Sequence, residues 1–173
     1  IELYAVWEDS KVYSLVLKDK ADSEQVLGTM YYRSGDGWYK DETCREKLTK
    51  LSIPERKSEV NFYSGRSDIS NPESIEYGWT FKGYKSFDEA TTYISASGEV
   101  QNVRISSNTI GYAVWAADKS IELKNLSESV HDSEYEFMGW SDDDGRTLIN
   151  GLRYNVNETY GDSIVLIGIW KDK

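Results

Sequence analysis

Three short apolar runs that each end in tryptophan constrain the fold of this chain more than any other feature. They occupy residues 3–7, 111–115 and 167–170, and each leads into charged residues. A short apolar run bounded by polar residues is typical of a β-strand that leaves a hydrophobic core. The interval from Trp7 to Trp115 is close to twice the interval from Trp115 to Trp170. The sequence therefore predicts a repeated β module in which one copy is longer than the other.

A second motif, Phe-x-Gly-aromatic, precedes the last two of these runs. It begins at Phe81 and again at Phe137. The distance from this marker motif to the tryptophan that closes the repeat agrees between the two copies to within one residue. Two independent markers in one register indicate an internal repeat. The residues expected to define the repeat structurally are Trp7, Phe81, Gly83, Trp115, Phe137, Gly139 and Trp170.

A surplus of aromatic residues and a shortage of proline predict a mainly β fold, a β-rich α+β class. The chain has 13 Tyr and 6 Trp but only 2 Pro, a balance that favours strands over disorder. Short helical turns are expected near residue 86 and over 41–48 and 125–130. Strands are predicted over residues 2–8, 11–18, 27–33, 37–40, 59–64, 79–84, 110–116, 120–124, 135–140 and 163–171.

The acidic charge balance excludes several kinds of partner. The net charge is −10, which repels nucleic acid and anionic membrane surfaces. No apolar run approaches the roughly 18 residues that a spanning helix needs, so we expect no membrane insertion. A single cysteine, Cys44, excludes a disulfide framework.

Catalytic machinery is not evident in the sequence. His131 is the sole histidine and lies in a polar segment before a predicted strand, where a solvent-facing loop position is expected. Cys44 has no neighbouring histidine to act as its base. One cysteine and one histidine cannot form a zinc site, and no phosphate-binding glycine-rich loop is present. We therefore predict no catalytic residue and no enzymatic activity.

An aromatic hairpin over residues 31–39 is the candidate ligand-binding site. Because side chains alternate between the faces of a strand, some of its rings are expected on the outer face. An exposed aromatic patch there would bind sugar rings or a protein partner. The alternative is that the same rings pack against a neighbouring module. The candidate residues are Tyr31, Tyr32, Trp38 and Tyr39.

An acidic run is the candidate metal site. Asp142, Asp143 and Asp144 lie between Ser141 and Gly145, and such loops offer the oxygen ligands that calcium prefers. The run lacks the alternating ligand spacing of an EF-hand. Aspartate and glycine also form turns, so an acidic hairpin tip is the alternative. No cofactor is expected apart from this possible calcium ion.

The two copies together resemble a known bacterial repeat. Residues 80–84 (Thr-Phe-x-Gly-Tyr), 93–100 and 108–115 resemble, in that order, the Listeria-Bacteroides repeat, a surface module related to the B repeats of internalin. Residues 135–170 are similar to a second, shorter copy. Residues 3–7 are similar to the end of a preceding copy.

The resemblance implies small β-grasp-like modules displayed on the bacterial cell surface. It divides the chain into the closing strand of a preceding repeat (1–10), a long module that contains the aromatic hairpin (11–117) and a short module (118–173). Alternatively, residues 11–66 form a degenerate copy of their own.

The expected function is that of an extracellular spacer, stalk or adhesion segment without enzymatic activity. Neighbouring repeats and a surface protein or glycan are the implied partners. The alternative function is a carbohydrate- or protein-binding module that uses the aromatic hairpin.

Overall fold

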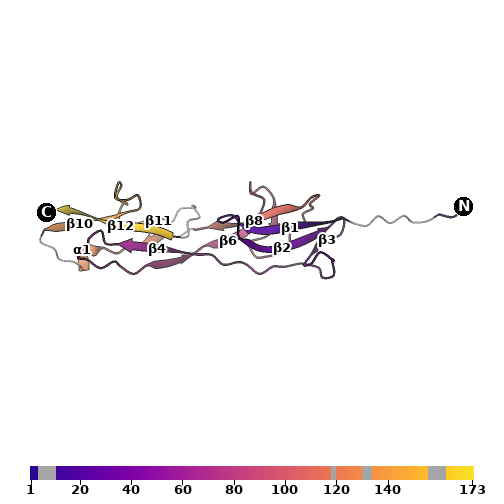
Figure 1. Cartoon of the computed structure of the whole chain (residues 1–173), viewed down its shortest axis with the longest axis horizontal. Helices are drawn as coiled ribbons and strands as arrows, with labels where there is room; N and C mark the ends of the chain where they lie inside the picture. The colour runs from indigo at the N-terminus through magenta and orange to yellow at the C-terminus, as the bar shows by residue number, and fades with distance from the viewer. Residues whose placement is uncertain (4–10, 118–119, 130–133, 156–162) are drawn as a thin grey trace. The chain divides into compact units, whose positions relative to one another are not determined.

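A computed structural model describes residues 1–3, 11–117, 120–129, 134–155 and 163–173. These residues form strands almost throughout, which confirms the predicted mainly β class. The only helix in the described ranges is α1 (Leu126–Ser129), inside a segment predicted to form a helical turn. The strands are β1 (Val12–Asp19), β2 (Val26–Arg33), β3 (Gly37–Tyr39), β4 (Lys57–Tyr63), β5 (Ile75–Gly78), β6 (Thr80–Lys85), β7 (Thr92–Ile94), β8 (Thr109–Ala116), β9 (Ser120–Glu122), β10 (Tyr135–Ser141), β11 (Arg153–Asn155) and β12 (Ser163–Asp172) (Figure 1).

The chain forms two compact units from interleaved segments. Unit 1 consists of Ile1–Pro54 and Phe81–Trp115, and unit 2 of Glu55–Thr80 and Ala116–Lys173. The predicted modules 11–117 and 118–173 differ from these units. Residues 55–80 were expected in the long module but belong to unit 2, because strand β4 pairs with β12. The predicted closing strand over 1–10 lies mostly outside the described residues.

Unit 1 is built on one sheet, in which β1 and β8, its first and last long strands along the chain, are parallel neighbours. Its strand order is β3-β2-β1-β8-β6-β7. Strands β1 and β2 form an antiparallel hairpin in which Leu15 faces Met30. On its other edge β1 pairs in parallel with β8, from Leu15 opposite Thr109 to Asp19 opposite Ala113. Alternation along β1 directs Leu15 and Leu17 into the core, and both are buried.

Unit 2 is built on a four-stranded sheet with the order β10-β12-β4-β5. Strands β4 and β5 form an antiparallel hairpin. Strand β4 pairs in parallel with β12, from Glu59 opposite Ser163 to Tyr63 opposite Ile167. Strand β10 pairs with β12 in antiparallel fashion and has a register irregularity after Phe137. Strands β9 and β11 form a separate two-stranded sheet.

The two main sheets share one plan. The order β2-β1-β8-β6 in unit 1 matches the order β5-β4-β12-β10 in unit 2. When the closing strands β8 and β12 are aligned on their tryptophans, Leu15 falls at the position of Val60, and both side chains are fully buried. In the same alignment, Asp19 of unit 1 corresponds to Ser64 of unit 2. Along the chain, the sheet of each unit therefore starts with an antiparallel hairpin, and its last long strand pairs in parallel with the first strand of that hairpin. A β-grasp sheet wrapped on a helix stays a prediction.

Candidate functional site

The closing tryptophan of each unit ties the last strand to the end of the first strand. The indole nitrogen of Trp115 donates a hydrogen bond to the Asp19 carboxylate at 2.9 Å. The indole nitrogen of Trp170 donates to the backbone oxygen of Ser64 at 2.7 Å. Asp19 ends β1 and Ser64 directly follows β4. The two bonds therefore occupy the same place in the two sheets.

The marker motif packs against the closing tryptophan in both units. The ring centroids of Phe81 and Trp115 lie 5.6 Å apart, and those of Phe137 and Trp170 lie 5.1 Å apart. Such tilted and edge-to-face pairs stabilise a core beyond the area they bury. The marker glycines Gly83 and Gly139 have positive φ angles of 115° and 137°, a region that favours glycine. The packing of Phe81 on Trp115 in unit 1 is thus repeated by Phe137 on Trp170 in unit 2. Trp7 lies outside the described residues.

The acidic run forms a turn that also occurs in unit 1. The hydroxyl of Ser141 donates to the Asp143 carboxylate at 2.7 Å, as Ser86 donates to Asp88 at 2.6 Å. The next residue has a left-handed conformation in both turns, with φ of 57° at Asp144 and 62° at Glu89. The acidic segment is therefore the second copy of one turn.

Two of the three carboxylates proposed as metal ligands, those of Asp142 and Asp143, accept hydrogen bonds within unit 2. The Ser141 hydroxyl, with Thr147, holds the pKa of Asp143 at about 2. Asp142 accepts a hydrogen bond from the Tyr154 hydroxyl at 3.2 Å. Burial, with the Asp142 charge, raises the pKa of Tyr154 to about 12. Among the described residues, no group of three or more His, Cys, Asp or Glu side chains is placed to hold a metal ion.

Acidification is expected to loosen this turn only at very low pH. Because the folded pKa of Asp143 lies below its ordinary value of 3.8, its ionised form stabilises the turn above pH 3.8. That contribution is lost as the pH falls toward 2. An NMR titration of the Thr147 amide, which donates to Asp143 at 2.7 Å, should have a midpoint near pH 2. Asp144→Asn should leave this midpoint unchanged, and a wild-type midpoint near 3.8 would contradict the account.

The aromatic hairpin is part of the core of unit 1, and the predicted exposed patch is wrong for three of its four residues. Tyr32, Trp38 and Tyr39 are each at most 6% exposed. The rings of Tyr32 and Trp38 lie 5.0 Å apart, and the Trp38 indole donates to the backbone oxygen of Val103 at 3.0 Å. The segment around Val103 thus supplies the polar partner that the buried Trp38 indole needs. Tyr31 is half-buried and lines a small cavity of about 320 Å³.

Of the two residues considered for covalent catalysis, Cys44 is the one that the described part of the chain contains. Burial raises the pKa of the Cys44 thiol, which opposes formation of the reactive thiolate. His131 lies outside the described residues. Neither residue is therefore shown in an arrangement suited to covalent catalysis.

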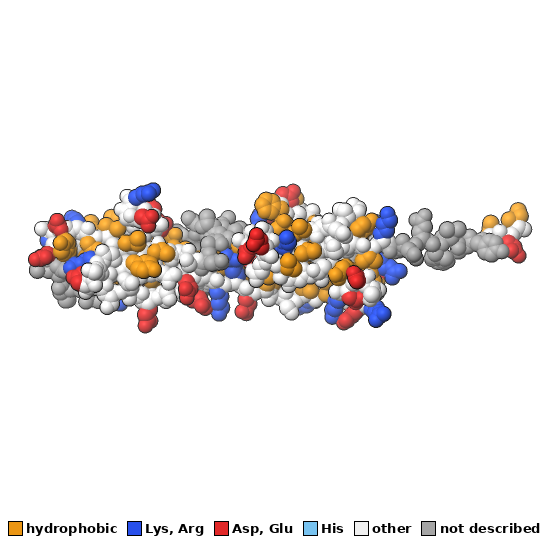
Figure 2. All heavy atoms as spheres, in the orientation of Figure 1, with side chains coloured by type: hydrophobic (Ala, Val, Ile, Leu, Met, Phe, Trp, Pro, Cys, Tyr) orange, Lys and Arg blue, Asp and Glu red, His pale blue; other side chains and the backbone are white. Residues whose placement is uncertain are grey.

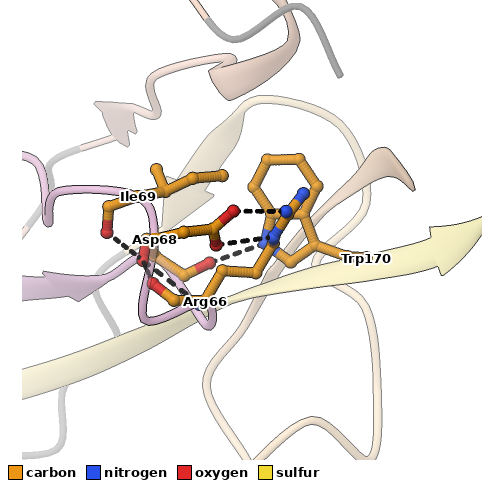
Figure 3. Close-up of polar contacts among 5 residues, drawn as sticks. Arg66, Asp68, Ile69 and Trp170 are labelled. Carbon is orange, nitrogen blue, oxygen red and sulfur yellow. Dashed lines mark hydrogen bonds and ion pairs between the residues drawn. The ribbon is translucent and has the colours of Figure 1, made fainter. Parts of the chain in front are cut away.

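An open groove in unit 2 was not predicted from the sequence. It has a volume of about 570 Å³ and lies beside Trp170. The Arg66 guanidinium lies 4.6 Å from the Tyr135 ring centroid and 5.2 Å from that of Trp170. Arg66 also donates two hydrogen bonds to Asp68, at 3.0 Å and 2.6 Å (Figure 3). The groove therefore combines aromatic surface with a fixed pair of opposite charges.

Comparison with known proteins identifies no relative. No family model, no curated protein and no solved structure matches the chain. The resemblance to the Listeria-Bacteroides repeat therefore stays a prediction. Within the described segments, no helix is long and apolar enough to cross a membrane.

Proposed function

We propose that this chain is a non-enzymatic segment of a bacterial cell-surface protein that acts as a spacer, stalk or adhesion segment and carries tension. The observation that supports this function best is the parallel pairing of the first and last long strands in each unit. The extracellular location rests on the family resemblance. The implied partners are neighbouring repeats and a protein or glycan at the surface.

In unit 1, the points where tension enters and leaves lie at opposite ends of the parallel pair. Tension from the N-terminal side enters at Lys11, directly before β1. The chain passes to unit 2 after Pro54 and again after Trp115, which lies at the C-terminal end of β8. Since β1 and β8 are parallel, that end is far from Lys11. Phe81, where the chain re-enters unit 1, contacts the Trp115 ring and so lies at the same far end.

Unit 2 has the same loading geometry. Arg56 directly precedes β4, and its backbone oxygen accepts a hydrogen bond from the Trp79 amide at 2.9 Å. Two of the three chain connections between the units, at 54/55 and 80/81, therefore lie near the start of β4. The C-terminal side pulls from Asp172, which ends β12 and lies beyond the other end of the parallel pair.

Opposite loading points convert tension into shear along the parallel ladder. In shear, the evenly spaced hydrogen bonds of a parallel pair carry the force together. A strand that is peeled from its neighbour loses those bonds one at a time at much lower force. Both units are thus arranged to resist extension.

Charge supports the role of a spacer. The net charge of −10 keeps like modules apart and soluble. Lys, Arg, Asp and Glu side chains project from the visible face of both units (Figure 2). The alternative of a binding module built on the aromatic hairpin is not retained, because Tyr32, Trp38 and Tyr39 are buried.

Single-molecule pulling tests this proposal. In a Cys44→Ser background, introduced cysteines at positions 11 and 173 would hold the chain across both parallel pairs. We expect this geometry to rupture at a force several-fold higher than a second geometry with cysteines at 11 and 34. Residues 11 and 34 are adjacent, since the Ser34 amide donates to the Lys11 oxygen at 2.8 Å, so pulling there peels β1 from β2. Similar rupture forces in the two geometries would contradict a load-bearing function.

A further inference from the structure

We infer that the groove beside Trp170 in unit 2 binds a neutral glycan. The inference is independent of the proposed tension-bearing function, because glycan binding is measured without load. It rests on a difference between two otherwise matching sites and on the chemistry of the residues that make this difference.

Unit 1 provides an internal reference for the groove. Trp115 and Trp170 have the same place in their sheets, but Trp115 is only 3% exposed while Trp170 is half-buried. The turn beside each tryptophan is also the same. The amide of Ala21 donates to Asp19 at 2.9 Å, as the amide of Arg66 donates to the Ser64 hydroxyl at 3.2 Å. With the same backbone turn beside it, Trp115 is thus buried in unit 1, whereas Trp170 lines a groove in unit 2.

The side chains that differ are those that form the groove. Where unit 1 has the methyl group of Ala21, unit 2 has a guanidinium between the rings of Tyr135 and Trp170. The Arg66 side chain is only 16% exposed, and its fork of hydrogen bonds to Asp68 fixes its plane. The Asp68 side chain is 62% exposed and the Tyr135 residue 37% exposed. The groove therefore presents an ordered aromatic and polar surface to solvent.

This surface matches a sugar ring. A pyranose has apolar C–H faces that pack on aromatic rings and hydroxyl edges that both donate and accept hydrogen bonds. Tyr135 and Trp170 offer the part of their aromatic surface that is exposed to solvent. The exposed Asp68 carboxylate, held in place by Arg66, keeps acceptor lone pairs for sugar hydroxyls because each of its oxygens can accept more than one hydrogen bond. A volume of about 570 Å³ lies within the range of small-ligand pockets.

Charge selects neutral over acidic glycans. The positive charge of Arg66 is paired with Asp68 at 2.6 Å, so the groove offers no unbalanced positive charge to a carboxylate or sulfate group. The chain as a whole carries −10, which repels acidic sugars. The ligand class is therefore an uncharged oligosaccharide.

The test is an NMR titration of the whole chain with neutral gluco-, manno- and galacto-oligosaccharides, and with sialyllactose as an acidic probe. We expect the indole resonance of Trp170 to shift saturably with at least one neutral sugar. The indole of Trp115, buried in the matching site, should stay in place and is a control within the same molecule. Arg66→Ala should weaken binding about tenfold or more, since it removes the charged hydrogen bonds that hold the Asp68 carboxylate in place.

Arg153→Ala is the matched control, because it removes one arginine of unit 2 that lies outside the groove and should keep the affinity. Folding of each variant is checked by the dispersion of the remaining indole resonances. The inference is overturned if no neutral oligosaccharide moves Trp170 at millimolar concentration. It is equally overturned if Arg66→Ala, while folded, binds as tightly as the wild type, or if sialyllactose binds better than the neutral sugars.

Discussion

Trp140→Ala is expected to lower the free energy of unfolding of unit 2 by about 3–5 kcal/mol, the usual cost of removing a large aromatic side chain from a core. Trp140 is fully buried. Its ring lies 5.1 Å from that of Phe62 and 5.4 Å from that of Phe137. Its indole nitrogen also donates to the backbone oxygen of Lys124 at 2.8 Å. The substitution therefore leaves a cavity at the point where three segments of unit 2 meet.

Denaturant unfolding followed by circular dichroism measures this loss. The control is Met138→Ala on the same strand, because Met138 is 39% exposed and should cost less than about 1 kcal/mol. Equal stabilities for the two variants would mean that Trp140 does not occupy the centre of the unit 2 core.

Gly65→Ala is expected to have the second large effect, because it combines backbone strain with a collision. Gly65 has a φ of 81°, where an alanine costs roughly 1–2 kcal/mol. A Cβ atom there would also lie 2.2 Å from the backbone oxygen of Gly168 on β12. Because the atoms that the Cβ would meet belong to the Gly168 backbone, the collision can be relieved only if the end of β12 moves away from the turn after β4. Overpacking of this kind adds about 1–3 kcal/mol.

Gly151→Ala separates strain from collision within the same unit. Gly151 has a similar φ of 73°, but no atom lies within 4 Å of the added Cβ. This variant should lose only the strain energy, roughly 1–2 kcal/mol. The two variants are compared by denaturant unfolding under the same conditions. If the Gly65→Ala variant is no less stable than the Gly151→Ala variant, Gly65 does not lie as close to the Gly168 backbone of β12 as described here.

Local sequence pattern predicted most strands because their aromatic and β-branched residues are concentrated and bounded by turn formers. The contacts between the marker motif and the closing tryptophan were not predicted, because equal spacing along the chain does not tell which rings touch in the fold. Strands β5, β7 and β11 were not predicted. They have only three or four residues each, too few for an alternating pattern to stand out.

The interleaving of the two units was beyond local pattern. Residues 55–80 look the same in sequence whether β4 pairs with a strand of unit 1 or with β12. That choice depends on which apolar faces fit together, a tertiary effect that overrides local preference. The same effect buried the aromatic hairpin. The alternation of side chains along its strands predicts that Trp38 and Tyr39 lie on opposite faces, but it does not tell which face is covered.

The groove beside Trp170 had no signal of its own in the sequence. Arg66 and Asp68 lie in a polar turn that reads as an ordinary loop. The signal that could have found it is the comparison of copies, which sets Arg66 against Ala21 once the closing tryptophans are aligned. That alignment needs the pairing of β4 with β12, which only the structure provides.

The central claim is that each sheet closes by pairing its first long strand in parallel with its last, from interleaved segments. Backbone nuclear Overhauser effects on the labelled chain test it most directly. We predict contacts between Val16 and Ile110 across β1 and β8, and between Asn61 and Val165 across β4 and β12. Backbone contacts of residues 57–63 with strands β6 or β8 instead of β12 would show modules that follow one another along the chain, and would contradict the account.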